Sequence, residues 1–182
     1  MKWTILSSEY LFRDQWFRVR RDVCETPQGK IVEPYYVYEF PTWVAAFALT
    51  EDGKVILIRQ YRHALEEVCI ELAGGCVDES DKDYEAAIAR EMLEETGYSF
   101  QSFVHLGRIS ANPSTNNNVL HMYLALGGKK TAEQSLDPNE EIEVLLYTMD
   151  EFKQLLRENK ILQAMHVSCI MYALAKLNEL RY

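Results

Sequence analysis

The sequence has no long apolar run and is short of basic residues. No stretch approaches the roughly 18 to 20 apolar residues of a membrane-spanning helix, and Arg13, Asp14 and Arg18 interrupt the beginning of the chain before a signal peptide could form. Lys and Arg number 19 against 28 Asp and Glu, a formal charge of −9. This deficit of basic residues argues against nucleic acid and against an anionic membrane surface as partners.

Cysteine is also scarce and widely spaced. Cys24, Cys69, Cys76 and Cys169 include no Cys-x-x-Cys pair. The spacing excludes a common zinc motif and a disulfide framework for a chain of this size. We therefore expect a cytoplasmic protein whose cysteines are small buried or half-buried hydrophobic residues.

Internal repeats and low-complexity segments are missing too. Of the 182 residues, 48% are apolar and 26% are charged, which is typical of a folded globular protein. A chain of this length forms one domain of ordinary size with, at most, a short extension. The remaining question is where the surplus acids lie, because carboxylates gathered in one place bind cations.

The first forty residues favour antiparallel strands. Residues 16–23 alternate in polarity, and residues 32–40 are rich in Tyr and Val. Pro41 then interrupts the pattern. We therefore predict an N-terminal antiparallel β extension at 1–40 and a main domain at 41–182.

The main domain mixes strand and helix signals. Strands are predicted at 44–49, 55–61, 68–72, 103–109, 119–126 and 142–147, and helices at 83–96, 149–158 and 162–177. Asp52-Gly53 is a strong hairpin signal, and Gly97 is a common residue at a helix C-terminus. Strands on both sides of a central helix, with helices at the end, predict an α+β fold arranged as an α/β/α sandwich.

Glutamates crowd one arc of the predicted central helix. At about 100° per residue, Glu91, Glu94 and Glu95 project together. Like charges at this spacing, and acids near a helix C-terminus, both destabilise the helix. A divalent cation would offset both costs, and oxygen ligands suit Mg²⁺ or Mn²⁺. A solvated acidic face is the alternative interpretation.

The other residues of this helix have separate expected roles. Ile88, Met92 and Leu93 project onto one apolar face, which we expect to be buried. Arg90 lies one turn before Glu94, so its guanidinium is expected to hold that carboxylate by a charge-assisted hydrogen bond.

At this point the sequence resembles the Nudix hydrolases, whose signature runs G-x5-E-x7-R-E-U-x-E-E-x-G-U with U a bulky apolar residue. Arg90 to Tyr98 (REMLEETGY) matches every specified position of the second half. In the first half, counted from Gly75, Asp81 replaces the glutamate, and one additional residue separates it from Arg90. The resemblance implies that the predicted sandwich is the Nudix fold.

Further motifs resemble the ADP-ribose and nucleoside-diphosphate-sugar pyrophosphatase branch. Residues 59–62 (RQYR) are similar to a strand end of that branch, and residues 71–75 (ELAGG) to its Glu-Leu-Pro-Ala-Gly without the proline. Pro113 stands at the position of a proline typical of ADP-ribose pyrophosphatases. The resemblance implies a homodimer through exchanged N-terminal strands, and an ordinary sheet edge is the alternative.

The implied activity is Mg²⁺-dependent hydrolysis of the pyrophosphate bond in a nucleoside diphosphate sugar of the ADP-ribose or GDP-mannose type. The products would be a nucleoside monophosphate and a sugar phosphate. Because a diphosphate and an acidic protein repel each other, more than one cation is expected between them. The alternatives are a dinucleoside polyphosphate or nucleoside triphosphate as substrate, or a non-catalytic ADP-ribose sensor.

The resemblance also implies roles for acids. Glu91 and Glu95 would be the principal metal ligands together with the carbonyl of Gly74, and Glu94 would share or support them. The general base would come from the loop before the last strand. Glu140 is the first choice there and is also assigned to the metal, and Glu141 is the alternative; a solvated loop acid is the other interpretation of Glu140.

Substrate contacts are assigned more broadly. Arg62 is expected to clamp the diphosphate, because a planar guanidinium matches phosphate oxygens. Trp43 and Trp16 offer stacking faces for the base, and Asn112 lies in a polar loop that could reach sugar hydroxyls. The alternatives are a surface arginine, two tryptophans of the core or of a dimer interface, and an ordinary turn.

Overall fold

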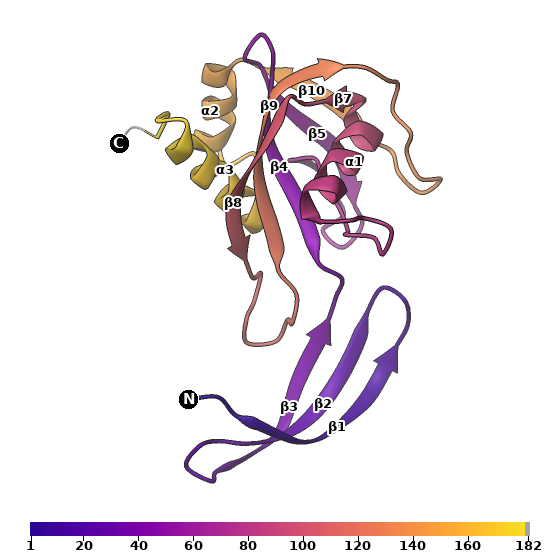
Figure 1. The fold of residues 1–182 in the computed structure, drawn as a ribbon, viewed down its shortest axis with the longest axis vertical. Coiled ribbons are helices and arrows are strands. Elements are labelled where there is room, and N and C mark those ends of the chain that lie inside the picture. The colour runs from indigo at the N-terminus through magenta and orange to yellow at the C-terminus, as the bar shows by residue number, and fades with distance from the viewer. Residues whose placement is uncertain (181–182) are drawn as a thin grey trace. The chain divides into compact units, whose positions relative to one another are not determined.

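The computed structural model describes residues 1–180, which form two compact units (Figure 1). The first unit contains residues 1–42 and 110–119, and the second contains residues 43–109 and the chain from 120 onward. Within the described residues, no helix is long and apolar enough to cross a membrane.

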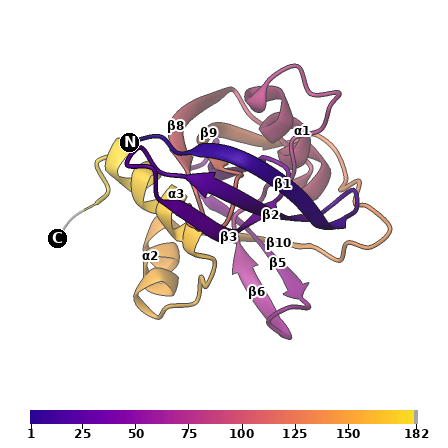
Figure 2. The same ribbon diagram turned by 90° about the horizontal axis from the view of Figure 1, so that it is seen from below.

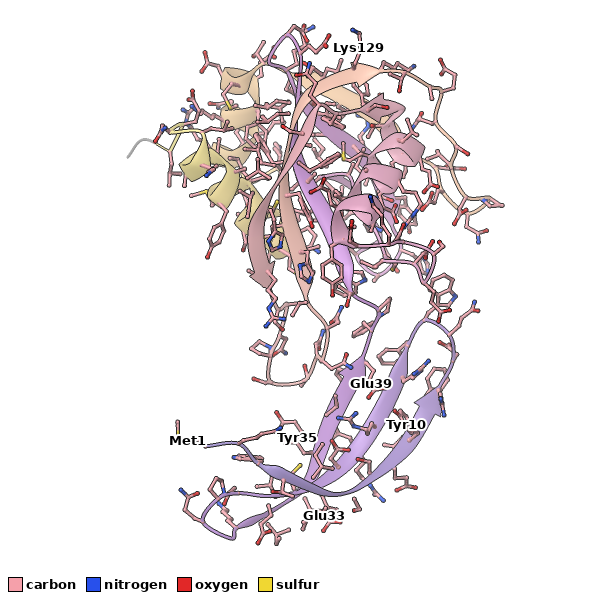
Figure 3. The ribbon with its side chains drawn as sticks, in the orientation of Figure 1. Met1, Tyr10, Glu33, Tyr35, Glu39 and Lys129 are labelled. Carbon is pink, nitrogen blue, oxygen red and sulfur yellow. The ribbon has the colours of Figure 1, made fainter. Side chains whose placement is uncertain are left out.

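The first unit is a three-stranded antiparallel sheet in the order β1-β2-β3. Its strands are β1 (Thr4–Arg13), β2 (Arg18–Glu25) and β3 (Ile31–Glu39). Figure 2 shows the strands side by side, and Tyr10 of β1 donates a hydrogen bond to Glu39 of β3 at 3.1 Å (Figure 3). The predicted antiparallel structure is confirmed, although β1 was not foreseen as a strand.

A distant loop completes this unit. The N–H of Tyr38 donates to the carbonyl of Thr115 at 2.7 Å, and the N–H of Asn117 donates to the carbonyl of Tyr38 at 3.1 Å. Asn118 adds a side-chain hydrogen bond to the carbonyl of Pro41 at 2.8 Å. The loop 110–119 is therefore held to β3 by backbone pairing as well as by side chains.

The second unit is built on a mixed seven-stranded sheet in the order β10-β5-β4-β9-β7, with β6 beside β5 and β8 beside β9. Its strands are β4 (Trp43–Thr50), β5 (Val55–Arg62), β6 (Glu67–Glu71), β7 (Tyr98–Ser99), β8 (Ser102–Ile109), β9 (Leu120–Lys130) and β10 (Glu143–Tyr147). β4 and β9 are parallel, whereas the other pairs are antiparallel.

Helices cover both faces of this sheet. They are α1 (Tyr84–Thr96), α2 (Met149–Arg157) and α3 (Ala164–Lys176). Figure 1 shows α1 on one face, and α2 with α3 on the other. Along β4, Ala46 belongs to the core under α1, whereas Ala45 and Phe47 belong to the core under α2 and α3. The alternation follows the period of two of a strand, and the predicted α/β/α sandwich is confirmed.

Local signals set the limits of α1. The side chain of Asp83 accepts a hydrogen bond from the N–H of Ala86 at 2.7 Å and caps the N-terminus. At the other end Gly97 adopts φ 75°, and its N–H donates to the carbonyl of Leu93 at 2.9 Å. A Cβ at Gly97 would lie 2.2 Å from the carbonyl oxygen of Ala132, so both conformation and space require glycine.

The buried face of α1 differs in part from the prediction. Ile88 and Met92 are buried as expected, but Leu93 is 37% exposed and Glu95 is only 5% exposed. Glu95 is seven residues after Ile88 and therefore projects close to it on the helix. The arc that faces the sheet therefore includes Glu95, whose carboxylate accepts a hydrogen bond from the backbone N–H of Gly74.

Candidate active site

Glu95 is a buried carboxylate at the centre of the candidate site. Its Oε2 accepts the N–H of Gly74 at 2.8 Å. Burial raises the pKa of Glu95 to about 8, and the nearby carboxylates of Glu91 and Glu140 add to the shift, while Arg62 opposes it. The protein thus keeps an acid in a place where its own cations do not fully compensate the negative charge.

Glu91 lies next to Glu95 on the helix and against the glycine loop. Burial raises the pKa of Glu91 to about 7, although Arg90 donates a hydrogen bond to it at 3.0 Å. A Cβ at Gly75 would lie 2.7 Å from the Glu91 carboxylate, so only glycine permits this approach. The loop and the helix are therefore fitted to each other around the carboxylate.

Arg90 is enclosed by carboxylates. Its Nη1 donates to Glu94 at 2.9 Å as well as to Glu91, which confirms the predicted bond between Arg90 and Glu94. Its Nη2 donates to the backbone carbonyl of Cys76 at 3.0 Å. The guanidinium thereby links the last turns of α1 to the loop that follows Gly75.

Asp81 completes the surroundings of Arg90. Its two carboxylate oxygens accept Nε and Nη2 of Arg90 at 3.1 and 2.9 Å, and its side chain is 6% exposed. The hydrogen bond from Arg90 lowers the pKa of Asp81. Asp81 reaches the arginine despite the extra residue between them, and a turn closed by hydrogen bonds between Asp78 and Asp81 precedes it.

The loop between β9 and β10 brings Glu140 toward these acids. The charge of Glu140 raises the pKa of both Glu91 and Glu95. Its carboxylate accepts the N–H of Asp137 at 3.1 Å, and the residue is exposed. An exposed acid near these two less accessible ones is suited to accept a proton from water.

Gln134, which sequence reasoning missed, fastens this loop to α1. Its Nε2 donates to the carbonyls of Glu95 and Ile142 at 2.7 and 3.0 Å. The N–H of Ser135 donates to the carbonyl of Glu94 at 2.9 Å. These bonds satisfy carbonyls that a helix C-terminus leaves without partners, and they fix both ends of the segment before β10. No sequence signal distinguishes Gln134 from other loop residues.

Arg62 and Glu71 form an ion pair at the ends of β5 and β6. Nε of Arg62 lies 3.1 Å from each carboxylate oxygen of Glu71, and Nη2 also donates to this carboxylate. The Glu71 side chain is 4% exposed, whereas that of Arg62 is 45% exposed. Glu71 was not among the expected site residues, although it is the first residue of the ELAGG motif that marked this segment.

Comparison with known proteins identifies the family. A model described as the NUDIX domain matches residues 40–165, and one described as the nucleoside diphosphate sugar hydrolase N-terminal domain matches residues 3–38. The chain belongs to the NUDIX family. Its resemblance to the Nudix signature is thereby confirmed.

Relatives of this Nudix protein match nearly the whole chain. It is 28% identical to the methanol dehydrogenase activator of Bacillus methanolicus and 26% identical to the ADP-ribose pyrophosphatase of Bacillus subtilis, in each case over 92% of this chain and 90% of the relative. A crystal structure of an ADP compounds hydrolase superposes with a TM-score of 0.82 at 24% identity, covering 99% of this chain and 98% of that one. The structural match supports the fold.

Nudix hydrolases generally use divalent metal ions, and the donors in this chain suit such an ion. Glu91 and Glu95 offer carboxylate oxygens with raised pKa values, which a cation would lower. The carbonyls of Ala73 and Gly75 accept N–H groups of β4, whereas the carbonyl of Gly74 accepts no hydrogen bond within residues 1–180. A carbonyl without a partner within residues 1–180, beside one buried and one half-buried carboxylate, fits a hard divalent cation.

The carboxylates are not arranged as a finished ligand set. Across the described part of the chain, no three His, Cys, Asp or Glu side chains converge in a geometry that could hold a metal ion. Glu91 and Glu94 instead accept hydrogen bonds from the same nitrogen of Arg90. Arg90 therefore supplies the positive charge that stabilises these two glutamates in this conformation.

The remaining predicted residues have local roles. Trp43 is half-buried at the start of β4, where it forms an isolated β-bridge with Cys76. Trp16 is exposed in the first unit, in the turn between β1 and β2. Asn112, also in that unit, accepts the N–H of Ser114 at 3.2 Å through its side chain, as expected of a turn residue.

Proposed function

We propose that this Nudix protein hydrolyses the pyrophosphate bond of nucleoside diphosphate sugars such as ADP-ribose, with Mg²⁺ as the metal. The proposal rests chiefly on the incompletely neutralised carboxylates of half-buried Glu91 and buried Glu95, beside the carbonyl of Gly74, which has no partner within residues 1–180. The similarity to an ADP-ribose pyrophosphatase along nearly the whole chain supports the substrate class.

Each acid has a distinct role in this proposal. Glu91, Glu95 and the Gly74 carbonyl hold more than one Mg²⁺, and Glu94 supports them, since its charge is shared with Arg90. When bound, the ions neutralise the diphosphate and favour ionisation of the attacking water. The protein contributes the placement of these oxygens: Gly75 leaves room for the Glu91 carboxylate, and Gly74 lets the loop approach the backbone of β4.

Glu140 accepts the proton in the hydrolytic step, and Glu141 is the alternative. Water adds to one phosphorus atom, the bridging P–O bond breaks, and the two phosphates leave with the nucleoside and with the sugar. The water proton passes to the Glu140 carboxylate and from there to solvent. Glu140 suits the role because it is exposed and its charge acts on both Glu91 and Glu95.

Other residues bind the substrate in this scheme. Arg62 donates to oxygens of the diphosphate from the end of β5. Trp43 or Trp16 stacks on the base, and Asn112 reaches a sugar hydroxyl. We propose the bounds of the Nudix domain at 41–182 and those of the N-terminal extension at 1–40.

The N-terminal extension is also proposed to form a homodimer. All ten residues of β1 are exposed, and they include Leu6, Leu11 and Phe12. An exposed apolar edge strand is a typical site for pairing with another chain. Light scattering should therefore give the mass of a dimer for the full chain, and L6E/F12E should give a monomer. A monomeric wild-type protein at micromolar concentration would contradict dimerisation.

A substrate panel tests the activity. ADP-ribose, GDP-mannose, diadenosine tetraphosphate and GTP are incubated separately with the full-length protein and Mg²⁺, and the products are separated by ion-exchange chromatography. We expect AMP with ribose 5-phosphate from ADP-ribose. Release of pyrophosphate from GTP, without cleavage of either sugar nucleotide, would contradict the proposal, and tight ADP-ribose binding without products would indicate a sensor.

A further inference from the structure

Glu71 is a buried acid outside the Nudix signature. It ends β6, where its side chain is 4% exposed, and the loop with the site glycines follows directly. The next residue is also fixed, because the N–H of Leu72 donates to Nδ1 of His166 on α3 at 3.3 Å. Glu71 is therefore carried on a rigid backbone.

The carboxylate of Glu71 holds one edge of the Arg62 guanidinium. It accepts Nε, which lies 3.1 Å from both oxygens, and it also accepts Nη2. A guanidinium has five N–H donors, and within residues 1–180 those of Nη1 make no hydrogen bond to the protein. Glu71 thus fixes the plane of the guanidinium and leaves one edge unoccupied.

The guanidinium of Arg62 lies near the candidate site. Arg62 acts on the buried carboxylate of Glu95, whose pKa it lowers against the effect of burial. Glu95 in turn raises the pKa of Arg62. The guanidinium therefore lies close to the acids that gather the metal and the diphosphate, with Glu71 on its other edge.

A second arginine of β5 shows what is particular about this pair. Arg59 donates to Glu143 of β10 through Nε at 2.8 Å and through Nη2, but both side chains of that pair are about half exposed. Exposed pairs of this kind contribute little to stability. Burying Glu71 instead carries a desolvation cost, and the benefit we assign to it is the fixed orientation of Arg62.

We infer that Glu71 is a positioning residue, which orients Arg62 so that its Nη1 edge binds the diphosphate of the substrate. The inference rests on the proposed function. A guanidinium fixed in advance loses less freedom when it binds an anion, so substrate affinity gains most. Because the contact persists from the bound substrate to the transition state, its loss should appear mainly in KM.

Steady-state kinetics with ADP-ribose and Mg²⁺ tests this role. E71Q keeps the shape and one acceptor of Glu71 but removes the charge, and we expect it to raise KM about tenfold while kcat stays within about threefold of wild type. R62K keeps the charge but not the planar fork, and it should raise KM by a similar factor. In the R62K background, E71Q should change KM less than about twofold, because the guanidinium that Glu71 orients is no longer present.

E143Q is the matched control. It removes the exposed acid that pairs with Arg59, which lies on β5 like Arg62, and its KM should equal that of wild type. Thermal unfolding of each variant identifies any that fails to fold. If E71Q does not fold, R62K provides the test, because it leaves no buried charge without a partner. An unchanged KM in folded E71Q, or in folded R62K, overturns the inference. Equal effects of E71Q with and without R62K also overturn it. If the wild-type protein cleaves no sugar nucleotide, the proposed function has failed instead.

Discussion

Two arginines of the candidate site, Arg90 and Arg62, are paired with acids in contrasting ways. Arg90, on α1, donates to Asp81, Glu91, Glu94 and the carbonyl of Cys76. Arg62, on β5, donates to Glu71 and retains the donors of Nη1. All three nitrogens of Arg90 are engaged within the protein, whereas one edge of Arg62 is left for a ligand.

The different pairing of Arg90 and Arg62 corresponds to two requirements of a site for a polyanion. The Arg90 side stabilises the protein's own carboxylates near one another, which repulsion would otherwise drive apart. The Arg62 side, in the proposed function, supplies positive charge for the substrate. Glu95 belongs fully to neither side, because its hydrogen bond comes from the Gly74 backbone and Arg62 compensates its charge only in part. Substitutions on the two sides should therefore fail in different ways.

The largest effect is expected at Glu95, between the two sides. E95Q keeps an acceptor for the N–H of Gly74 but removes the charge that a cation needs. We expect kcat with ADP-ribose and Mg²⁺ to fall by more than about a hundredfold, since loss of even an outer-shell partner of a metal commonly costs ten- to a hundredfold. Stability should not fall, because a buried charge has been removed.

Thermal unfolding with and without Mg²⁺ checks the reason for this loss. The wild-type melting temperature should rise with Mg²⁺, because a ligand that binds only the folded state stabilises it, and E95Q should lose that rise. An E95Q protein that keeps near-normal turnover would show that Glu95 is not a metal ligand.

Glu140 is the next test, because it approaches the paired acids from a separate loop. E140Q should lower kcat about a hundredfold, which is typical for loss of a general base, with little change in KM. E141Q is the matched control, and its kcat should stay within about threefold of wild type. Single-turnover measurements would show whether the chemical step is the one affected. A larger loss in E141Q than in E140Q would reverse the assignment.

A substitution at Asp81 tests the group of carboxylates around Arg90 without changing Arg62 or Glu71. D81N removes the charge of the bidentate partner, so Glu91 and Glu94 should be held less firmly, and we expect kcat to fall about tenfold. The unfolding free energy should fall by about 1 to 3 kcal/mol, because a buried charged hydrogen bond is weakened. D78N is the control, since Asp78 is 59% exposed and lies 3.7 Å from Nη2 of Arg90. Equal losses in the two variants would show that Asp81 has no special role.

Local signals explain which parts of the fold were predictable. The limits of α1 follow from a capping aspartate and a glycine with positive φ, and the structure agrees to within one residue. The parallel pairing of β4 with β9 joins residues more than seventy positions apart, which no local pattern encodes. β1 escaped notice because all of its residues are exposed, so it has no alternation of buried and exposed positions.

The residues of the candidate site also divide into those that local sequence patterns predict and those that only the folded structure reveals. Glu91, Glu94 and Glu95 were found because their spacing on one helix is visible in the sequence. A helical projection does not say which arc faces the sheet, however, so the burial of Glu95 in place of Leu93 was not anticipated. Glu71 and Gln134 act through partners in other elements, and only the folded chain brings them together.

The smallest effect on activity is expected at His166, which accepts the N–H of Leu72, the residue after Glu71. This histidine is buried, and burial lowers its pKa to about 4 from an ordinary value near 6.5. The folded protein therefore keeps His166 neutral, while the unfolded chain takes up a proton as the pH falls below about 6.5. Because the pKa of His166 is lower in the folded state than in the unfolded state, acid destabilises the fold. Its contribution to the free energy of unfolding is complete above about pH 6.5 and declines by about 3 kcal/mol in total as the pH falls toward 4.

Urea unfolding between pH 7 and 4 measures this contribution. H166Q keeps an acceptor for the N–H of Leu72 but does not titrate, so its stability should fall less steeply with acidification than that of wild type. H63Q, which removes an exposed histidine from the turn between β5 and β6, is the matched control and should follow the wild-type curve. At pH 7.5 the KM of H166Q should stay within about twofold of wild type, since the Leu72 backbone retains its acceptor. Parallel pH curves for H166Q and wild type would mean that acid destabilises the protein elsewhere, and a raised KM would mean that His166 helps Glu71 to orient Arg62.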